Sequence, residues 1–142
     1  MTIASFYAII DFTENRKNGW RINLNWEKFY QLEENRYYRF VATLQECGLF
    51  LLDENYIMIE TSIFEDFYID VRSNLCKDNL NFLLENGWIN QIIFQKCTQL
   101  YDKFCAIQKN FPEIWNINAI KTAPQWHEIL LLSDEIKSML YV

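Results

Sequence analysis

The sequence predicts a mainly helical single domain, a helical bundle with a small N-terminal β-hairpin; an α+β domain is the alternative. Three observations support this class. The 142 residues fit one domain with a sizeable core. Half of them (51%) are hydrophobic, which argues against global disorder. Only three glycines and two prolines occur, too few for the many tight turns of a sandwich or barrel. We therefore expect residues 1–142 to form a single domain.

The hairpin prediction comes from the first 26 residues. From Gly19 to Trp26 every second residue is apolar, a period typical of a strand with one buried face. The apolar run Ser5–Phe12 is its natural partner across a polar loop. Because an isolated two-stranded hairpin is only marginally stable, we expect it to pack on the helix that follows.

A long helix is predicted over residues 25–47, with Asn25 as N-cap and Gly48 as the left-handed residue that ends it. Its apolar positions repeat every three or four residues and form one stripe. They are Trp26, Phe29, Tyr30, Tyr37, Phe40, Val41 and Leu44. Residues 49–59 fit either a second short hairpin or a helical turn with a loop, and the β-branched content of residues 56–59 favours a strand.

Ser62 and Glu65 have the spacing of a capping box, which predicts the start of another helix. Its expected core stripe is Ile63, Phe64, Phe67, Tyr68 and Val71.

Three more helices complete the predicted bundle. One covers residues 76–86 and is stopped by Gly87, and one covers residues 88–110 and ends at Phe111. The last begins near Thr122, which has capping-box spacing to Gln125, and runs to residue 142.

The residue types needed for catalysis are scarce. The single histidine, His127, is predicted on the polar side of the last helix, opposite Trp126, Ile129, Leu130 and Ile136. There is no glycine-rich phosphate loop and no zinc-ligand spacing. The four cysteines are far apart and are expected to be reduced core thiols: Cys47, Cys76, Cys97 and Cys105. We expect no enzyme activity, no cofactor and no metal site.

Membrane and nucleic-acid partners are not expected either. No apolar run approaches the roughly 20 residues of a membrane span. The N-terminus reaches Asp11 without the basic region of a secretory signal. Thirteen basic residues are scattered, and a net charge of −6 has the wrong sign for phosphate binding. The sequence therefore predicts a cytoplasmic protein.

The acidic residues are concentrated in one segment. Residues 40–71 contain seven acidic residues and no Lys or Arg, so their charge of −7 exceeds the −6 of the whole chain. Two interpretations stay open. The acids form an ordinary solvated face, neutralised by distant lysines, or they form a surface for a basic partner, which would steer association. Tyr56 adds a common type of interface anchor. The candidate partner-binding residues are Glu46, Asp53, Glu54, Tyr56, Glu60, Glu65, Asp66 and Asp70.

The segment from Trp115 to Leu140 resembles a pattern seen in small immunity proteins of bacterial polymorphic-toxin loci, including contact-dependent growth inhibition systems. The residues that carry the resemblance are Ala119, Ile120, Lys121, Ala123, Pro124, Trp126, Glu128, Ile129 and Ile136. The resemblance implies a short helix, a corner at proline and a terminal helix. It further implies a stoichiometric inhibitor that binds and blocks a toxin domain, often a cationic nuclease.

The sequence thus leads to one functional hypothesis and two alternatives. The hypothesis is an immunity protein or antitoxin that neutralises a cognate basic toxin through the acidic residues between 46 and 70. The first alternative is a phage-encoded inhibitor of host defence, such as a nucleic-acid mimic with acids spaced like phosphates. The second is a helical adaptor or scaffold subunit, which should expose an apolar groove.

Overall fold

The computed structural model describes the backbone of residues 24–140 and the side chains of residues 33–140, and no β-strand occurs among the described residues. The predicted mainly helical class is confirmed, and the N-terminal hairpin lies outside the described residues. In chain order the helical elements are α2 (Leu24–Gln45), the 3-10 helix η2 (Leu49–Asp53), α3 (Tyr56–Ile59), the π-helix η3 (Glu60–Phe67), α4 (Tyr68–Asn74), α5 (Lys77–Glu85), α6 (Gln91–Asn110), the 3-10 helix η4 (Pro112–Ile114), α7 (Ile117–Thr122) and α8 (Pro124–Leu140).

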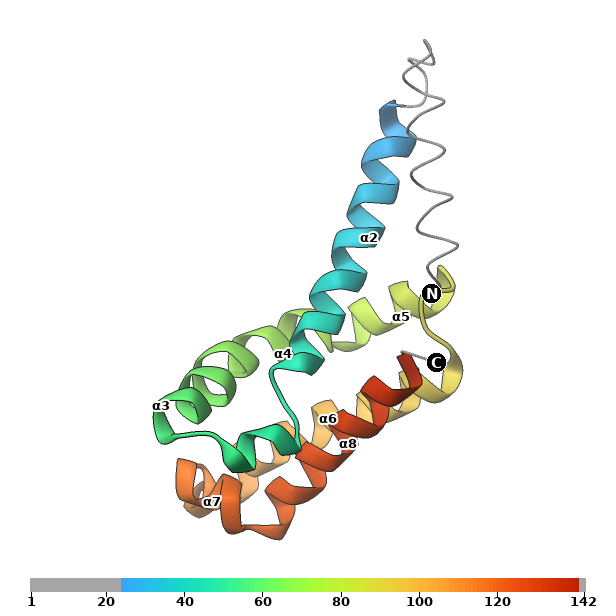
Figure 1. The fold of residues 1–142 in the computed structure, drawn as a ribbon. Coiled ribbons are helices and arrows are strands. Elements are labelled where there is room, and N and C mark those ends of the chain that lie inside the picture. The colour runs from blue at the N-terminus through green and yellow to red at the C-terminus, as the bar shows by residue number, and fades with distance from the viewer. Residues whose placement is uncertain (1–23, 141–142) are drawn as a thin grey trace.

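The helices form two packed layers around one core. Figure 1 shows α6 and α8 side by side, the α3–α4–α5 row above them, and α2 rising from the middle of that row. Large side chains from several elements meet without solvent exposure; among them are Phe40, Phe67, Phe104 and Trp126. Burial of such a side chain typically contributes about 1.5–3 kcal/mol. The predicted apolar stripe of α8 is confirmed, because all four of its residues are buried.

The predicted boundaries of the first long helix are wrong at both ends. Asn25 lies inside α2 and is not its N-cap. Gly48 is not left-handed, because its φ of 170° is extended backbone. Glycine is needed there for space. A Cβ at Gly48 would lie 2.5 Å from Oδ1 of Asp134 and 2.8 Å from Nζ of Lys137, both on α8.

Side chains of α8 hold the end of α2 and the start of η2. The hydroxyl of Ser133 lies 3.1 Å from the carbonyl oxygen of Leu44 and 2.8 Å from that of Cys47. Nζ of Lys137 donates to the same Cys47 carbonyl at 2.8 Å. Oδ2 of Asp134 accepts from the backbone N–H of Leu49 at 3.0 Å. Carbonyls at a helix end lack intrahelical partners, so these contacts satisfy groups that would otherwise be orphaned.

The strand predicted over residues 56–59 is wrong, and the helical alternative is correct. The side chain of Asn55 accepts from the backbone N–H of Met58 at 2.9 Å, which makes Asn55 the N-cap of a helix starting at Tyr56. The capping box at Ser62 is also wrong, since Ser62 lies within η3 and its hydroxyl donates to the carbonyl of Glu46 at 3.0 Å. The stripe predicted for this helix is confirmed by its buried members Ile63, Phe67 and Val71.

The later helices agree better with the sequence. α5 is followed by Gly87, the residue predicted to stop it, and Gly87 has a left-handed φ of 78°. α6 ends at Asn110 as predicted but begins after Asn90, whose side chain accepts from the N–H of Ile93 at 2.9 Å. Thr122 ends α7, so the last helix begins instead at Pro124.

We predict that Trp126→Ala lowers the free energy of unfolding by about 3–5 kcal/mol, because it leaves a cavity in the core. The indole N–H also loses its bond to the carbonyl of Ile114, 2.7 Å away. Chemical denaturation measures the effect. His127→Ala, one residue away and exposed as predicted, is the control and should change stability by less than about 0.5 kcal/mol. Equal stability of the two variants would contradict the burial of Trp126.

We predict that Gly48→Ala costs about 1–2 kcal/mol, because the added methyl displaces the hydrogen-bonded ends of Asp134 and Lys137. A double-mutant cycle with Asp134→Ala isolates the clash, since removing the Asp134 carboxylate opens the space. In the Asp134→Ala background, Gly48→Ala should then lower the free energy of unfolding clearly less. If the effects of the two substitutions on the free energy of unfolding are additive, the close approach of α8 is not the reason why glycine is needed at position 48.

Candidate interaction surface

The predicted partner-binding residues fall into two groups in the structure, with Glu65 exposed on η3 between them. The first group is Glu46, Asp66 and Asp70, where the end of α2 meets η3 and α4. Glu46 is half-buried there, and both aspartates act on its carboxyl. The bond from Ser62 to the Glu46 carbonyl fixes this junction.

Glu46 does not behave as a surface charge. Its Oε2 is buried and accepts no hydrogen bond from a described residue. Burial, together with the neighbouring carboxylates of Asp70 and Asp66, raises the pKa of Glu46 to about 9. The carboxyl is therefore protonated at neutral pH and can donate to Asp70.

The second group surrounds the corner between η2 and α3, and we call Phe50, Asp53, Glu54, Tyr56, Ile57, Met58 and Glu60 the corner surface. Asp53, Tyr56 and Glu60 are exposed, and Glu54 is half-buried. Lys121 of α7 donates to the backbone carbonyl of Glu54 at 2.9 Å, and its Nζ lies 5.7 Å from the centre of the Tyr56 ring. This contact joins the corner to α7.

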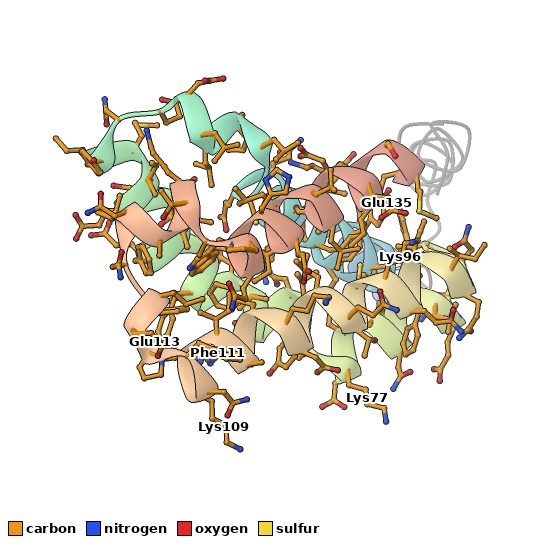
Figure 2. The ribbon with its side chains drawn as sticks, turned by 90° about the horizontal axis from the view of Figure 1, so that it is seen from below. Lys77, Lys96, Lys109, Phe111, Glu113 and Glu135 are labelled. Carbon is orange, nitrogen blue, oxygen red and sulfur yellow. The ribbon has the colours of Figure 1, made fainter. Side chains whose placement is uncertain are left out.

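The exposed acids of the segment form no ion pair with the basic side chains of residues 33–140. The ion pairs in this part of the chain join Lys96 to Glu135 at 2.8 Å, Lys103 to Glu128 at 3.4 Å and Lys137 to Asp134 at 3.0 Å. Figure 2 shows the first of these pairs between α6 and α8, and it shows the side chains of Lys77 and Lys109 pointing outward. No pair includes a carboxylate of residues 40–71.

Sequence reasoning identified Tyr56 but missed the other apolar residues of the corner surface, Phe50, Ile57 and Met58. The exposed fractions are 57% for Tyr56, 44% for Phe50, 75% for Ile57 and 48% for Met58. Residues 49–59 contain more apolar residues than one short amphipathic element can bury, and that excess was the available signal. Aromatic residues and Met are enriched at protein interfaces, so acids and apolar anchors lie together here.

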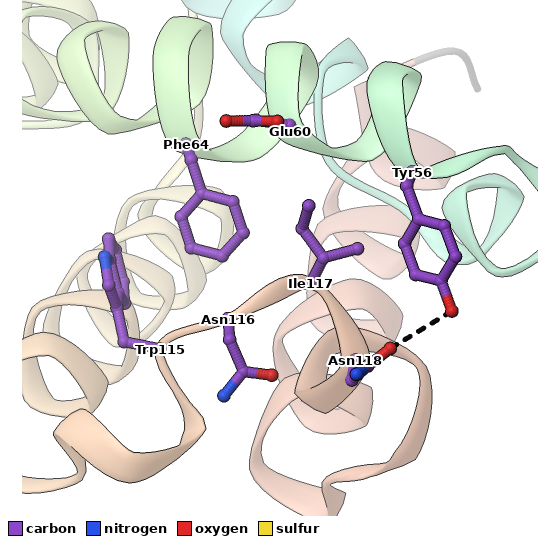
Figure 3. A pocket seen from close by; sticks show the side chains of 7 residues that line it. All are labelled: Tyr56, Glu60, Phe64, Trp115, Asn116, Ile117 and Asn118. Carbon is purple, nitrogen blue, oxygen red and sulfur yellow. Dashed lines mark hydrogen bonds between the residues drawn. The ribbon is translucent and has the colours of Figure 1, made fainter.

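A pocket of about 650 Å³ opens beside the corner surface. Figure 3 shows Tyr56, Glu60 and Phe64 on one side and residues 115–118 on the other. The hydroxyl of Tyr56 donates to Oδ1 of Asn118 at 3.1 Å and closes one end. Trp115 at the other end meets Phe64 edge to face, with ring centres 5.1 Å apart.

The described residues offer little for covalent or metal chemistry. No group of three or more His, Cys, Asp or Glu side chains that could hold a metal ion occurs among them. All four cysteines are free thiols; Cys47 and Cys97 are buried, and burial raises the pKa of each to about 12. A buried neutral thiol is a poor nucleophile. None of the described helices has the length and apolar character required to span a membrane.

No family model matches this chain, and neither the curated proteins nor the solved structures contain a match. The interpretation of the surface therefore depends on its geometry and charge.

We predict that Glu46→Gln removes a pH dependence of stability. The folded pKa is above the ordinary value of 4.5, so the folded state retains a proton that the unfolded state releases. The wild-type free energy of unfolding should therefore fall from about pH 5 to about pH 9. The variant should lose this slope and be more stable at neutral pH. Chemical denaturation across this pH range measures the slope. If the free energy of unfolding changes with pH in the same way in both proteins, Glu46 is not the group responsible.

Proposed function

We propose that this chain is a protein-binding module that captures a basic protein partner at its corner surface and acts by binding rather than by catalysis. One observation carries the proposal. The acids Asp53, Glu54 and Glu60 form no ion pair with a side chain of residues 33–140, and they flank α3, which exposes Tyr56 and Ile57.

The two kinds of side chain have different roles in this proposal. Unpaired carboxylates raise the rate of encounter with a positively charged protein and orient it. Exposed apolar and aromatic side chains supply the area whose burial holds the complex together. A solvated acidic face would not require Ile57 and Met58 to be exposed beside it.

We propose further that the partner is a toxin domain and that the chain is its immunity protein, acting in the cytoplasm of a bacterium. The resemblance of the C-terminal segment supports this class. Its residues form α7, a corner at Pro124, and α8 with Trp126 fully buried. Bound at the corner surface, the protein would block the toxin by occupying its basic active-site face, as expected for a nuclease.

The exposed apolar residues also favour the second candidate, a helical adaptor or scaffold subunit. Salt separates the two functions, because charge-steered association slows steeply with ionic strength whereas apolar docking does not. The nucleic-acid mimic has less support, since the acids gather in two groups, and Glu46 is neutral at neutral pH.

We predict that Asp53→Lys with Glu54→Lys slows capture of the partner at least tenfold at low salt, a change of the size that charge steering produces. The wild-type chain captures the partner from the native host, and surface plasmon resonance then measures association rates with the purified partner. Asp78→Lys with Glu85→Lys is the matched control. It makes the same change in net charge on α5, at the far end of the upper row (Figure 1).

The control should stay close to the wild-type rate, and both double variants should keep their helical circular dichroism. Equal rates for the two double variants would contradict the corner surface. A partner without excess positive charge would contradict the proposal itself.

A further inference from the structure

We propose that the pocket beside the corner surface binds the guanidinium group of an arginine side chain, with Glu60 as the anion and Phe64 and Trp115 as stacking surfaces. The assignment of the pocket to a guanidinium group does not depend on the proposed function. The further claim, that this arginine belongs to the captured partner, rests on the proposed function.

Glu60 supplies the charge. It is exposed at the start of η3, and its carboxylate forms no ion pair or hydrogen bond with another side chain of residues 33–140. In Figure 3 the carboxylate lies at the rim above the ring of Phe64 and the side chain of Ile117. A carboxylate beside aromatic walls favours a cation.

The other polar groups that line the pocket already have partners. Oδ1 of Asn116 accepts from the N–H of Ala119 at 2.9 Å, and Nδ2 of Asn116 donates to the carbonyl of Glu113 at 3.0 Å. Oδ1 of Asn118 accepts from Tyr56, as described above. These bonds fix the floor and one end, and Glu60 is left as the carboxylate available to a ligand.

None of the described residues that line the pocket is basic. Nζ of Lys121, near the Tyr56 end, is held by the Glu54 carbonyl. The guanidinium of Arg72 stacks on Tyr68, behind Trp115, and does not line the pocket either. An anionic ligand would therefore meet the charge of Glu60 without a basic side chain among the lining residues, whereas a cation would meet a carboxylate.

The aromatic wall is held in place before any ligand binds. The ring of Trp115 packs against Phe64, Phe104 and Trp126, with centre-to-centre distances of 5.1, 5.3 and 5.7 Å. A wall that needs no ordering loses little entropy on binding. The volume of about 650 Å³ leaves room for an arginine side chain and its backbone.

Arginine fits this wall better than lysine. The guanidinium is planar and weakly hydrated, so it stacks on an aromatic face while donating two parallel hydrogen bonds to one carboxylate. The ammonium of lysine is a compact, strongly hydrated point charge that cannot do both.

The test is a nuclear magnetic resonance titration of the full chain with Nα-acetyl-arginine amide and with the corresponding lysine and citrulline amides. Citrulline has nearly the shape of arginine without the charge. We expect saturable shifts of the Trp115 indole N–H and the Asn118 side-chain amide with arginine. Lysine should bind at least about fivefold more weakly, because it lacks the stacked, bidentate geometry. Citrulline should not bind.

Glu60→Gln keeps the size of the side chain and removes its charge, and we expect it to weaken arginine binding at least tenfold, the scale of a lost charge-assisted pair. Glu65→Gln is the matched control, an exposed acid in the same π-helix that does not line the pocket, and it should bind arginine as the wild type does. Unchanged binding by Glu60→Gln, equal loss in Glu65→Gln, equal binding of lysine or citrulline, or shifts elsewhere would each overturn the proposal.

Failure here is distinguishable from failure of the proposed function. If the arginine amide does not bind but Asp53→Lys with Glu54→Lys still slows partner capture, only the pocket assignment is lost. If the amide binds in the pocket while that double variant captures the partner at the wild-type rate, the corner surface is wrong and the arginine pocket remains.

Discussion

The fold depends on the capping of α2 by side chains of α8. A helix C-terminus leaves carbonyl groups without intrahelical partners, and such groups are costly when they are buried. Ser133 and Lys137 satisfy the carbonyls of Leu44 and Cys47, and Asp134 receives the N–H of Leu49. Because this junction fixes where the chain leaves α2, it also fixes where η2 and α3 emerge. The corner surface and its pocket occupy the end of the molecule shared by α3 and α7 (Figure 1).

The helical segment that contains Glu65 and Asp66 is capped at Asn55 and not at Ser62, and this changes how these two acids are interpreted. With a start at Ser62, Glu65 and Asp66 would lie in the first turn, where the helix dipole stabilises negative charge. In the structure they lie more than two turns after the N-cap, beyond the reach of that effect. Their charges therefore receive no stabilisation from the helix end and no ion pair from a basic side chain of residues 33–140. This strengthens the case that a partner uses them.

The sequence predicted what depends on local periodicity. The buried stripe of Ile63, Phe67 and Val71 follows from 3–4 spacing, and the stop at Gly87 follows from the φ that glycine alone adopts easily. It could not predict features made by residues distant in the chain. Gly48 is needed because of Asp134 on α8. The pocket likewise joins residues 56–64 to residues 115–118, and no spacing within either segment indicates it.

Counting acidic residues in a sequence overestimates the charge that a partner meets. Glu46 is counted as one of seven, but desolvation and two aspartate neighbours keep its carboxyl protonated at neutral pH. The steering field therefore comes from the exposed acids of η2 and η3. These acids stand beside Tyr56, Ile57 and Met58, so encounter rate and residence time depend on different side chains. A partner that loses positive charge should bind more slowly yet dissociate at a similar rate. A partner that loses its apolar complement should meet the surface as fast and leave it sooner.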